Sequence, residues 1–436
     1  MRRGLVTLGL TFCLSLFSLC VVAQDGASSS VFSPYTMYGI GELSVGGTTA
    51  NRLMGGVGLG IRRSDVFNYM NPASLSAIAR KSAIFNFGGM AVNNYSQTLQ
   101  SKTSFSSFNM HDLGLAFPLA RGVGFGFSLT PVSDVGYSSY VIDNNQSVIE
   151  NIGRSVYTHS GEGGVSALSA HLGVMVFRGL SLGLTANYNF GVIDRYYNSD
   201  IYSLLDDSKY RSVKTVDNFH VSQFNFNIGL QYSMRVGPEA ALTLGVTYSP
   251  RSNSKARQSI FSASMNEGSF ADTLSYSKNE KVPFALPEKF AGGLFFVNKF
   301  IGVGVDYSYQ DWAGAFDIPA DQNTTMGAKH DVRFGVQYTP DRYSIRKALA
   351  RWTYKIGVRY TNSYVMRNNY NIDEYAVSLG VDIPLKLRSA SAASVGFEFG
   401  QRGAKVAGQA FEQYWKVFLG VSLFGDDGWF QRRKFN

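Results

Sequence analysis

The fold class is decided by residues 224–234, which read FNFNIGLQYSM. Apolar or aromatic residues occupy every second position, and Asn, Gly, Gln and Ser fill the positions between them. Successive side chains of a β-strand point to opposite faces, so this stretch predicts a strand with one apolar and one polar face. The same alternation recurs in residues 182–190, 301–310 and 354–361. The sequence therefore predicts an all-β protein.

A water-soluble sandwich would show the same alternation, but three features favour a transmembrane antiparallel β-barrel. The polar faces carry Gly, Ser, Thr, Asn and isolated charges, whereas a soluble exterior is dense in Lys and Glu. Aromatic residues gather at strand ends, as in residues 307–312, which is typical of interfacial girdles. The joints are unequal, as in a barrel with short periplasmic turns and long external loops. The tight joints are 178–179, 237–238 and 298–299, and the long polar ones are 137–163, 198–217, 262–282 and 317–329.

The composition excludes several classes of protein. Only 16% of the 436 residues are charged and 14% are aromatic, which argues against both a soluble cytoplasmic enzyme and a disordered chain. The formal net charge is +9, yet no basic run occurs before residues 431–434. No nucleic-acid partner is therefore expected.

Residues 1–23 are predicted to be a signal peptide. Arg2 and Arg3 precede an apolar stretch, and Val-Val-Ala at 21–23 supplies a cleavage site. A lipoprotein signal at Cys20 is disfavoured because Leu19 precedes it. Both cysteines of the chain, at positions 13 and 20, leave with the signal, so the mature protein has no thiol for a disulfide, a zinc site or covalent catalysis. The expected location is the outer membrane.

The strand count and the domain boundaries follow from the same pattern. About fourteen strands of roughly ten residues fit between residues 84 and 424, and an even number is usual for such barrels, with sixteen as the alternative. Residues 24–80 are Gly-rich without alternation and are predicted to be a hatch, or plug, inside the lumen. The barrel is assigned to residues 81–424 and a periplasmic tail to 425–436.

No catalytic, cofactor or metal site is predicted. The five histidines have no metal-ligand spacing, and the GVGLG run at 56–60 lacks the βαβ context of a dinucleotide loop. A lipid-modifying enzyme would have to use His159 with Ser160, and nothing supplies a complete set of catalytic groups around them. We therefore expect a protein that is not an enzyme.

Two groups of residues are candidates for a role in the lumen or the wall. Polar-face charges either hold the plug to the wall, which is the favoured interpretation, or line a ligand pathway. Pro131, Asp134 and Gly136 lie within one strand length and indicate either a break in the wall or an ordinary strand end. The candidate lumen charges are Asp306, Arg333, Arg359, Asp382 and Glu398.

Three segments together carry a family resemblance. Asn71-Pro72-Ala73-Ser74, residues 286–293 (LPEKFAGG) and residues 306–312 (DYSYQDW) resemble, in order and spacing, motifs of the FadL/TodX family of outer-membrane transporters. The resemblance implies a fourteen-stranded barrel closed by an N-terminal hatch, with Asn71, Pro72 and Ala73 in the hatch motif. It also implies a lateral exit for ligand at a kinked early strand, which corresponds to Pro131 through Gly136.

The chain termini, residues 33–41 and 429–434, are similar to those of divergent members from the Bacteroidota, where the related PorV-like barrels serve type IX protein secretion. Two functions are therefore expected from the resemblance. The first is passive uptake of hydrophobic or amphipathic small molecules such as long-chain fatty acids. The alternative is a non-transporting barrel in protein secretion or surface assembly. The implied partners are outer-membrane lipids and lipopolysaccharide, a hydrophobic ligand, or secretion-machine proteins.

Overall fold

The computed structural model describes residues 31–98, 101–151, 153–204, 209–266, 269–315, 324–367, 370–385, 390–405 and 409–425. The predicted signal peptide and all of the predicted tail except Gly425 lie outside these residues. Within the described part, no helix is long and apolar enough to cross a membrane.

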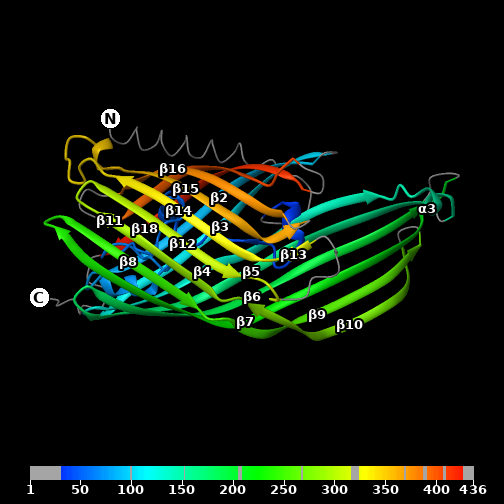
Figure 1. The fold of residues 1–436 in the computed structure, drawn as a ribbon, viewed down its shortest axis with the longest axis horizontal. Helices are drawn as coiled ribbons and strands as arrows, with labels where there is room; N and C mark the ends of the chain where they lie inside the picture. The colour runs from blue at the N-terminus through cyan, green and yellow to red at the C-terminus, as the bar shows by residue number, and fades with distance from the viewer. Residues whose placement is uncertain are drawn as a thin grey trace, which may run out of the picture.

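The described residues fold into an antiparallel sheet that closes on itself (Figure 1). Its first strand, β1 (Glu42–Leu43), belongs to the N-terminal segment, and the short helices are η1 (Pro34–Met37), α2 (Thr49–Arg52), η2 (Pro72–Ala77), α3 (Gln146–Asn151) and η3 (Leu349–Arg351). The other strands are β2 (Ala83–Gln97), β3 (Lys102–Ala120), β4 (Val123–Ile142), β5 (Arg154–Phe177), β6 (Leu180–Tyr202), β7 (Lys209–Gly237), β8 (Ala240–Ser249), β9 (Ser252–Asn266), β10 (Ser269–Leu286), β11 (Lys289–Val297), β12 (Ile301–Asp311), β13 (Thr324–Met326), β14 (Ala328–Tyr338), β15 (Thr353–Arg367), β16 (Tyr370–Pro384), β17 (Ala392–Arg402) and β18 (Phe411–Gly425).

The barrel has fourteen wall strands, as predicted. It closes where β18 pairs with β2 along its whole length, from Phe411 to Gly425. Three wall strands are interrupted: β8 continues as β9 against β7, β10 continues as β11, and β13 and β14 both pair with β15. The all-β fold class and the closed barrel are therefore confirmed.

The apolar face of each strand points outward. On β7, Phe224, Phe226 and Ile228 are exposed, whereas Gln223 and Gln231 on the other face are buried. The same holds on β12, where Val305 and Tyr307 are exposed and Asp306 is buried. A soluble protein would bury such side chains, so the exposed apolar band is a lipid-facing surface.

Strands β12, β14 and β17 have roughly the ten residues predicted, whereas most other wall strands are longer at the end opposite the tight turns. Much of the segments 137–163, 198–217 and 262–282, which the sequence analysis interprets as long loops, extends the hairpins β4–β5, β6–β7 and β9–β10. Residues 143–153 remain a connection, which contains α3. Strand β7 alone spans 29 residues. Outside the bilayer both faces of a hairpin meet water, so the ladder continues where the alternation of the sequence has ended.

The described part of the predicted hatch, residues 31–80, is here called the N-terminal segment. Most of its side chains are buried, including Leu53, Val57 and Phe67. Figure 1 draws it in blue within the outline of the barrel, and its hydrogen bonds run to the polar face of the wall.

A belt of wall glycines lets the N-terminal segment lie with its backbone directly on the wall. A Cβ built at Gly357 would overlap the backbone of Gly55, and one at Gly183 would overlap Ala73. Neighbouring strands align these positions, because Gly335 pairs with Gly357 and Gly173 pairs with Gly183. The glycine belt comprises Gly124, Gly173, Gly183, Gly229, Gly245, Gly335 and Gly357, each of which touches the N-terminal segment.

We predict that Gly357→Val displaces the N-terminal segment. The added side chain meets backbone that cannot rotate away, and overpacking of this kind costs about 1–3 kcal/mol. The expected result is faster proteolysis within residues 31–80 of the folded barrel. Gly292→Val is the matched control, because a Cβ at Gly292 meets nothing within 4 Å. Equal proteolysis of the two variants would contradict the prediction.

Candidate functional site

The Asn71-Pro72-Ala73 motif joins two parts of the N-terminal segment to the wall. The Asn71 side chain accepts a hydrogen bond from the backbone N–H of Ala73 (3.2 Å) and so caps η2. Its amide donates to the carbonyl of Leu59 (3.2 Å) and to that of Leu230 on β7 (3.1 Å). Pro72 lies against glycines of the belt. The motif therefore acts as a buried clamp in this structure.

Two of the candidate lumen charges hold the turn at residues 56–59. Asp306 accepts hydrogen bonds from the backbone N–H groups of Gly58 (2.7 Å) and Leu59 (2.9 Å). Arg333 donates to the carbonyl of Gly56 (2.9 Å) and forms an ion pair with Asp331. Both charges thus bind backbone of the N-terminal segment, and both also line a cavity inside the barrel.

Asp382 reaches the N-terminal segment through a lysine. Lys355 lies 2.5 Å from the Asp382 carboxylate and donates to the carbonyl of Ala50 (3.0 Å). Asp382 also accepts a hydrogen bond from Ser394 (2.7 Å). The three residues come from β15, β16 and β17, so they link neighbouring wall strands as well.

Arg359 and Glu398 belong to a network within the wall itself. Arg359 is buried and bonds to Glu374 (2.7 Å), Glu398 (3.4 Å) and the hydroxyl of Tyr414 (3.1 Å). Each member of such a buried network needs its partners, because an unpaired buried charge is strongly destabilising.

Sequence reasoning missed Arg402, which anchors the far end of the N-terminal segment. Its guanidinium lies 2.6 Å from Glu412 and 3.0 Å from Glu42, and it donates to the Ser33 hydroxyl (3.2 Å). Arg402 and Glu412 face each other in the β17–β18 ladder. The sequence places both residues on the polar faces of consecutive strands. It does not show that they pair, because the register of the two strands depends on where the connection between them begins and ends.

The wall has a gap between β3 and β4. Their ladder runs only from Ala120–Val123 to Leu113–Leu129, and beyond it β4 continues without β3. Pro131, Asp134 and Gly136 all lie on this unpaired length of β4. The expectation of an ordinary strand end here is wrong, because β4 continues through a bulge at Val132 and keeps its pairing with β5.

The N-terminal segment bonds to part of this unpaired edge. Strand β1 pairs with β4 as Glu42 with Asp134 and Leu43 with Ser133, and the N–H of Ser44 donates to the carbonyl of Val132 (2.9 Å). Further along, Gly136 accepts a hydrogen bond from the N–H of Ser33 (2.8 Å). Its own N–H donates to the hydroxyl of Thr36 (3.1 Å). Residues 33–44 are thus bonded to β4 between Val132 and Gly136, within the length that β3 leaves unpaired.

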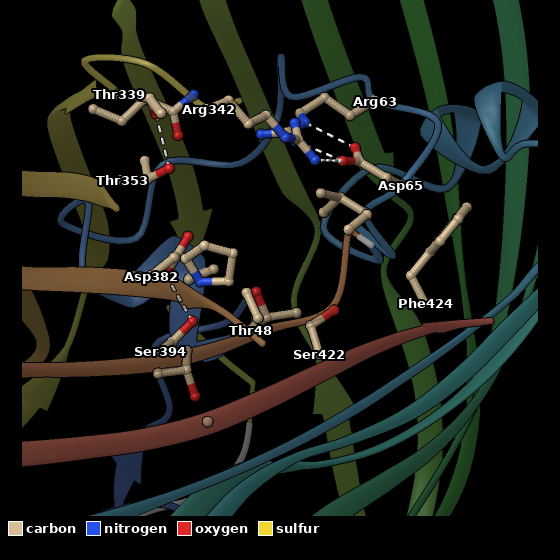
Figure 2. A pocket seen from close by; sticks show the side chains of 18 of the residues that line it. Thr48, Arg63, Asp65, Thr339, Arg342, Thr353, Asp382, Ser394, Ser422 and Phe424 are labelled. Carbon is tan, nitrogen blue, oxygen red and sulfur yellow. Dashed lines mark hydrogen bonds and ion pairs between the residues drawn. The ribbon is translucent and has the colours of Figure 1, made fainter. Parts of the chain in front are cut away.

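Two cavities inside the barrel have both polar and apolar lining residues. One of about 290 Å³ lies between the N-terminal segment and the wall. A second of about 670 Å³ lies at the end with the tight turns, and Figure 2 shows Thr48, Arg63, Asp65, Thr339 and Asp382 around it. The polar residues that line the smaller cavity include Ser169, Thr185, Asn187, Asn189, Asn225 and Asn227.

An ion-pair cluster lies at the mouth of the larger cavity (Figure 2). Asp65 contacts Arg63 of the N-terminal segment (2.7 Å) and Arg342 of the connection between β14 and β15 (2.9 Å). Burial acts to raise the pKa of Asp65, but the charge of Arg63 and the hydrogen bonds from both guanidiniums outweigh it and lower the pKa below its usual value. The carboxylate is therefore ionised at neutral pH.

The family to which the chain belongs is shown by a family model: the model described as BamG matches residues 6–436. The chain belongs to the BamG family. No curated protein matches this BamG-family chain.

Solved structures show its fold. A Pseudomonas aeruginosa FadL homologue is 13% identical, with a TM-score of 0.60, covering 86% of this chain and 98% of that one. The Pseudomonas putida toluene transporter TodX (13% identity, TM-score 0.52) and the Ralstonia pickettii toluene transporter TbuX (13%, 0.51) each cover 87% of this chain and 98% of their own. The BamG-family barrel therefore has a FadL-like fold, as predicted, and is an outer-membrane barrel.

The structure places the histidine that the sequence analysis considers for catalysis. His159 lies edge-on against Tyr197, with ring centroids 5.3 Å apart. Among the described residues, no group of three or more His, Cys, Asp or Glu side chains is placed to hold a metal ion.

We predict that Asp65→Asn loosens residues 61–66 at neutral pH, by on the order of 1 kcal/mol because Arg342 is half exposed. A carboxyl with a lowered folded pKa stabilises above its unfolded pKa of about 4, and this contribution is lost as the pH falls through the folded value. Hydrogen exchange of this peptide should therefore separate wild type from variant at pH 7, and the difference should shrink progressively below pH ~4. The control is Glu150→Gln, an exposed acid in α3. A difference that persisted unchanged in acid would count against the ion pair.

Proposed function

We propose that this chain is a non-transporting barrel that acts as a partner-binding component of a protein secretion or surface-assembly machine in the outer membrane. One observation supports the proposal: the same N-terminal segment that bonds to the polar face of the wall also bonds to β4 where β3 leaves its edge unpaired. A barrel without a passage acts through its surfaces, and binding to other proteins is the role that such surfaces serve.

Separating residues 33–44 from β4 would cost free energy. Release of residues 33–44 from β4 would break the hydrogen bonds of Ser33, Ser44 and Gly136 and separate Glu42 from Arg402. Each buried backbone group left without a partner costs about 1–3 kcal/mol, whereas Arg402 would keep Glu412 as an ion-pair partner. This free-energy cost favours a permanent structural element over a gate that opens for each ligand.

The lining of the inner cavity supports the same proposal. Amide and hydroxyl groups of Asn, Ser and Thr line it with Asp306 and Arg333, beside apolar side chains that include Leu59, Met70 and Trp312. A binding site for an apolar molecule is usually lined by hydrophobic and aromatic side chains with few polar groups. A fatty-acid-like ligand in this cavity would leave many polar groups without hydrogen-bond partners.

Transport of hydrophobic molecules is the second candidate, and the wall gap itself favours it. Two of the structural neighbours are described as toluene transporters. In this chain the gap at Pro131, Asp134 and Gly136 is the place where a ligand would leave sideways if residues 33–44 moved. The two candidates therefore differ in whether β1 has to leave β4.

A disulfide between β1 and β4 tests that difference. Leu43 and Ser133 are Cα partners, and the hydrogen bond from Ser44 to Val132 makes them a non-hydrogen-bonded pair, in which side chains approach closely. We predict that Leu43→Cys with Ser133→Cys forms a bridge and that the locked barrel still complements a strain lacking the protein. The proposed function requires no movement here.

Each single cysteine variant is the matched control, and a reducing agent restores the unlocked state. Liposomes containing the locked or the reduced protein should take up toluene or oleate no faster than empty liposomes. Loss of complementation that a reducing agent reverses, together with uptake by the reduced protein alone, would establish the transporter instead.

A further inference from the structure

One connection at the tight-turn end differs from its neighbours. This end is periplasmic, because transmembrane barrels place their short turns there. The connections β3–β4, β5–β6 and β7–β8 are two-residue turns. Residues 339–352, which join β14 to β15, form instead a much longer stretch that includes η3, here called the periplasmic loop.

The periplasmic loop is held in one shape by its own hydrogen bonds. The N–H of Asp341 donates to the carbonyl of Ala350 (2.8 Å), and the Arg351 guanidinium donates to the carbonyl of Ser344 (2.8 Å). The ion pair of Arg342 with Asp65 fixes the loop to the N-terminal segment. A surface held in this way loses little conformational entropy when it binds.

This ordered loop displays three large apolar side chains. Tyr343 is 74% exposed, Ile345 76% and Leu349 60%. They lie beyond the paired Tyr338 and Tyr354, the last aromatic pair of the β14–β15 ladder before the loop. Aromatic pairs at that position mark the edge of the bilayer, so the three side chains belong to the periplasmic side.

The charge of the loop restricts what could cover these side chains. Four of its residues are Arg or Lys and one is Asp. Arg342 and Arg351 are engaged within the protein, whereas among the described residues neither Arg346 nor Lys347 has an ion-pair partner. An occupant would therefore have to combine apolar surface with acidic groups.

The position of the loop favours a protein over the membrane surface. Arg342, Tyr343 and Arg351 line the cavity of about 670 Å³, together with Arg63 and Asp65 of the N-terminal segment (Figure 2). This part of the loop therefore borders the mouth of the barrel, away from the lipid-facing wall. A partner could insert a side chain there while its acidic groups meet Arg346 and Lys347.

We propose that the periplasmic loop is the docking site for a periplasmic protein, or a periplasmic domain, whose apolar groove is rimmed by acidic side chains. This inference rests on the proposed function and assigns its partner surface. Ile345 and Leu349 fill the groove, and Arg346 and Lys347 fix the orientation by charge.

The test places a photo-crosslinking amino acid at Ile345 of the full chain, expressed in its own outer membrane. Leu119, an exposed apolar residue near the β3–β4 turn, is the control position and should label lipid. The expected product at Ile345 is a discrete complex with an acidic protein. Double charge reversal, Arg346→Glu with Lys347→Glu, should lower its yield at least about tenfold, because like charges then face each other across the interface.

The matched control is Arg121→Glu with Arg178→Glu, two exposed arginines on other turns of the same end, and it should leave the yield unchanged. Labelling of phospholipid alone at Ile345, or a protein adduct unaffected by the reversal, would overturn the docking site. Native electrophoresis distinguishes failure of the docking site from failure of the proposed function. A partner complex that survives the reversal retains the proposed function and removes the loop from it, whereas wild-type barrel that migrates without any protein partner refutes both.

Discussion

The rest of this structure depends on direct contact between the backbone of the N-terminal segment and the glycine belt of the wall. At Gly357 and Gly183 the space that a Cβ would need is occupied by the backbone of Gly55 and Ala73. Packing at this distance leaves no room for a side chain between the segment and these glycines. It also brings backbone N–H and C=O groups of the segment within reach of polar side chains on the wall, so the glycines position the hydrogen bonds.

Those hydrogen bonds give several interior charges partners within the protein. Asp306, Arg333 and Lys355 each satisfy part of their bonding with backbone atoms of the N-terminal segment. A charge inside a barrel needs partners whether or not an ion or ligand passes. Removal of the segment would take these partners away, so the charges of the wall and the position of the segment depend on each other.

Sequence alone predicted the parts of this architecture that follow from local periodicity. Alternation in residues 224–234 predicted the strand and its two faces. It also predicted that Phe224 and Phe226 point outward, because an exposed surface made of apolar side chains is typical of contact with a bilayer. It could not give the length of β7, since alternation stops where water covers both faces. It also could not reveal β1, whose two residues carry no period, or the pairing of Arg402 with Glu412, which depends on register.

For the candidate site, the sequence predicted several of the residues but not the atoms that they bind. Asn71 and Pro72 were found through the motif, and Asp306 and Arg333 through their place on a polar face, but their partners are backbone atoms that no side-chain pattern encodes. The significance of Pro131 through Gly136 lies in the neighbour that β4 lacks rather than in the residues themselves. The residue pattern of one strand predicts that strand, but it does not show where the neighbouring strand stops pairing with it.

The wall gap explains how one fold can serve different functions. An unpaired strand edge within a membrane must be bonded to something, because hydrocarbon offers no hydrogen bonds. In this chain residues 33–44 meet that requirement between Val132 and Gly136 with backbone and hydroxyl groups. The likeness to the toluene transporters is a likeness of fold, and fold alone does not fix function. Under the proposed function, a short segment at one strand edge makes the difference between a passage and a closed barrel, because the unpaired edge of β4 is where the two would differ.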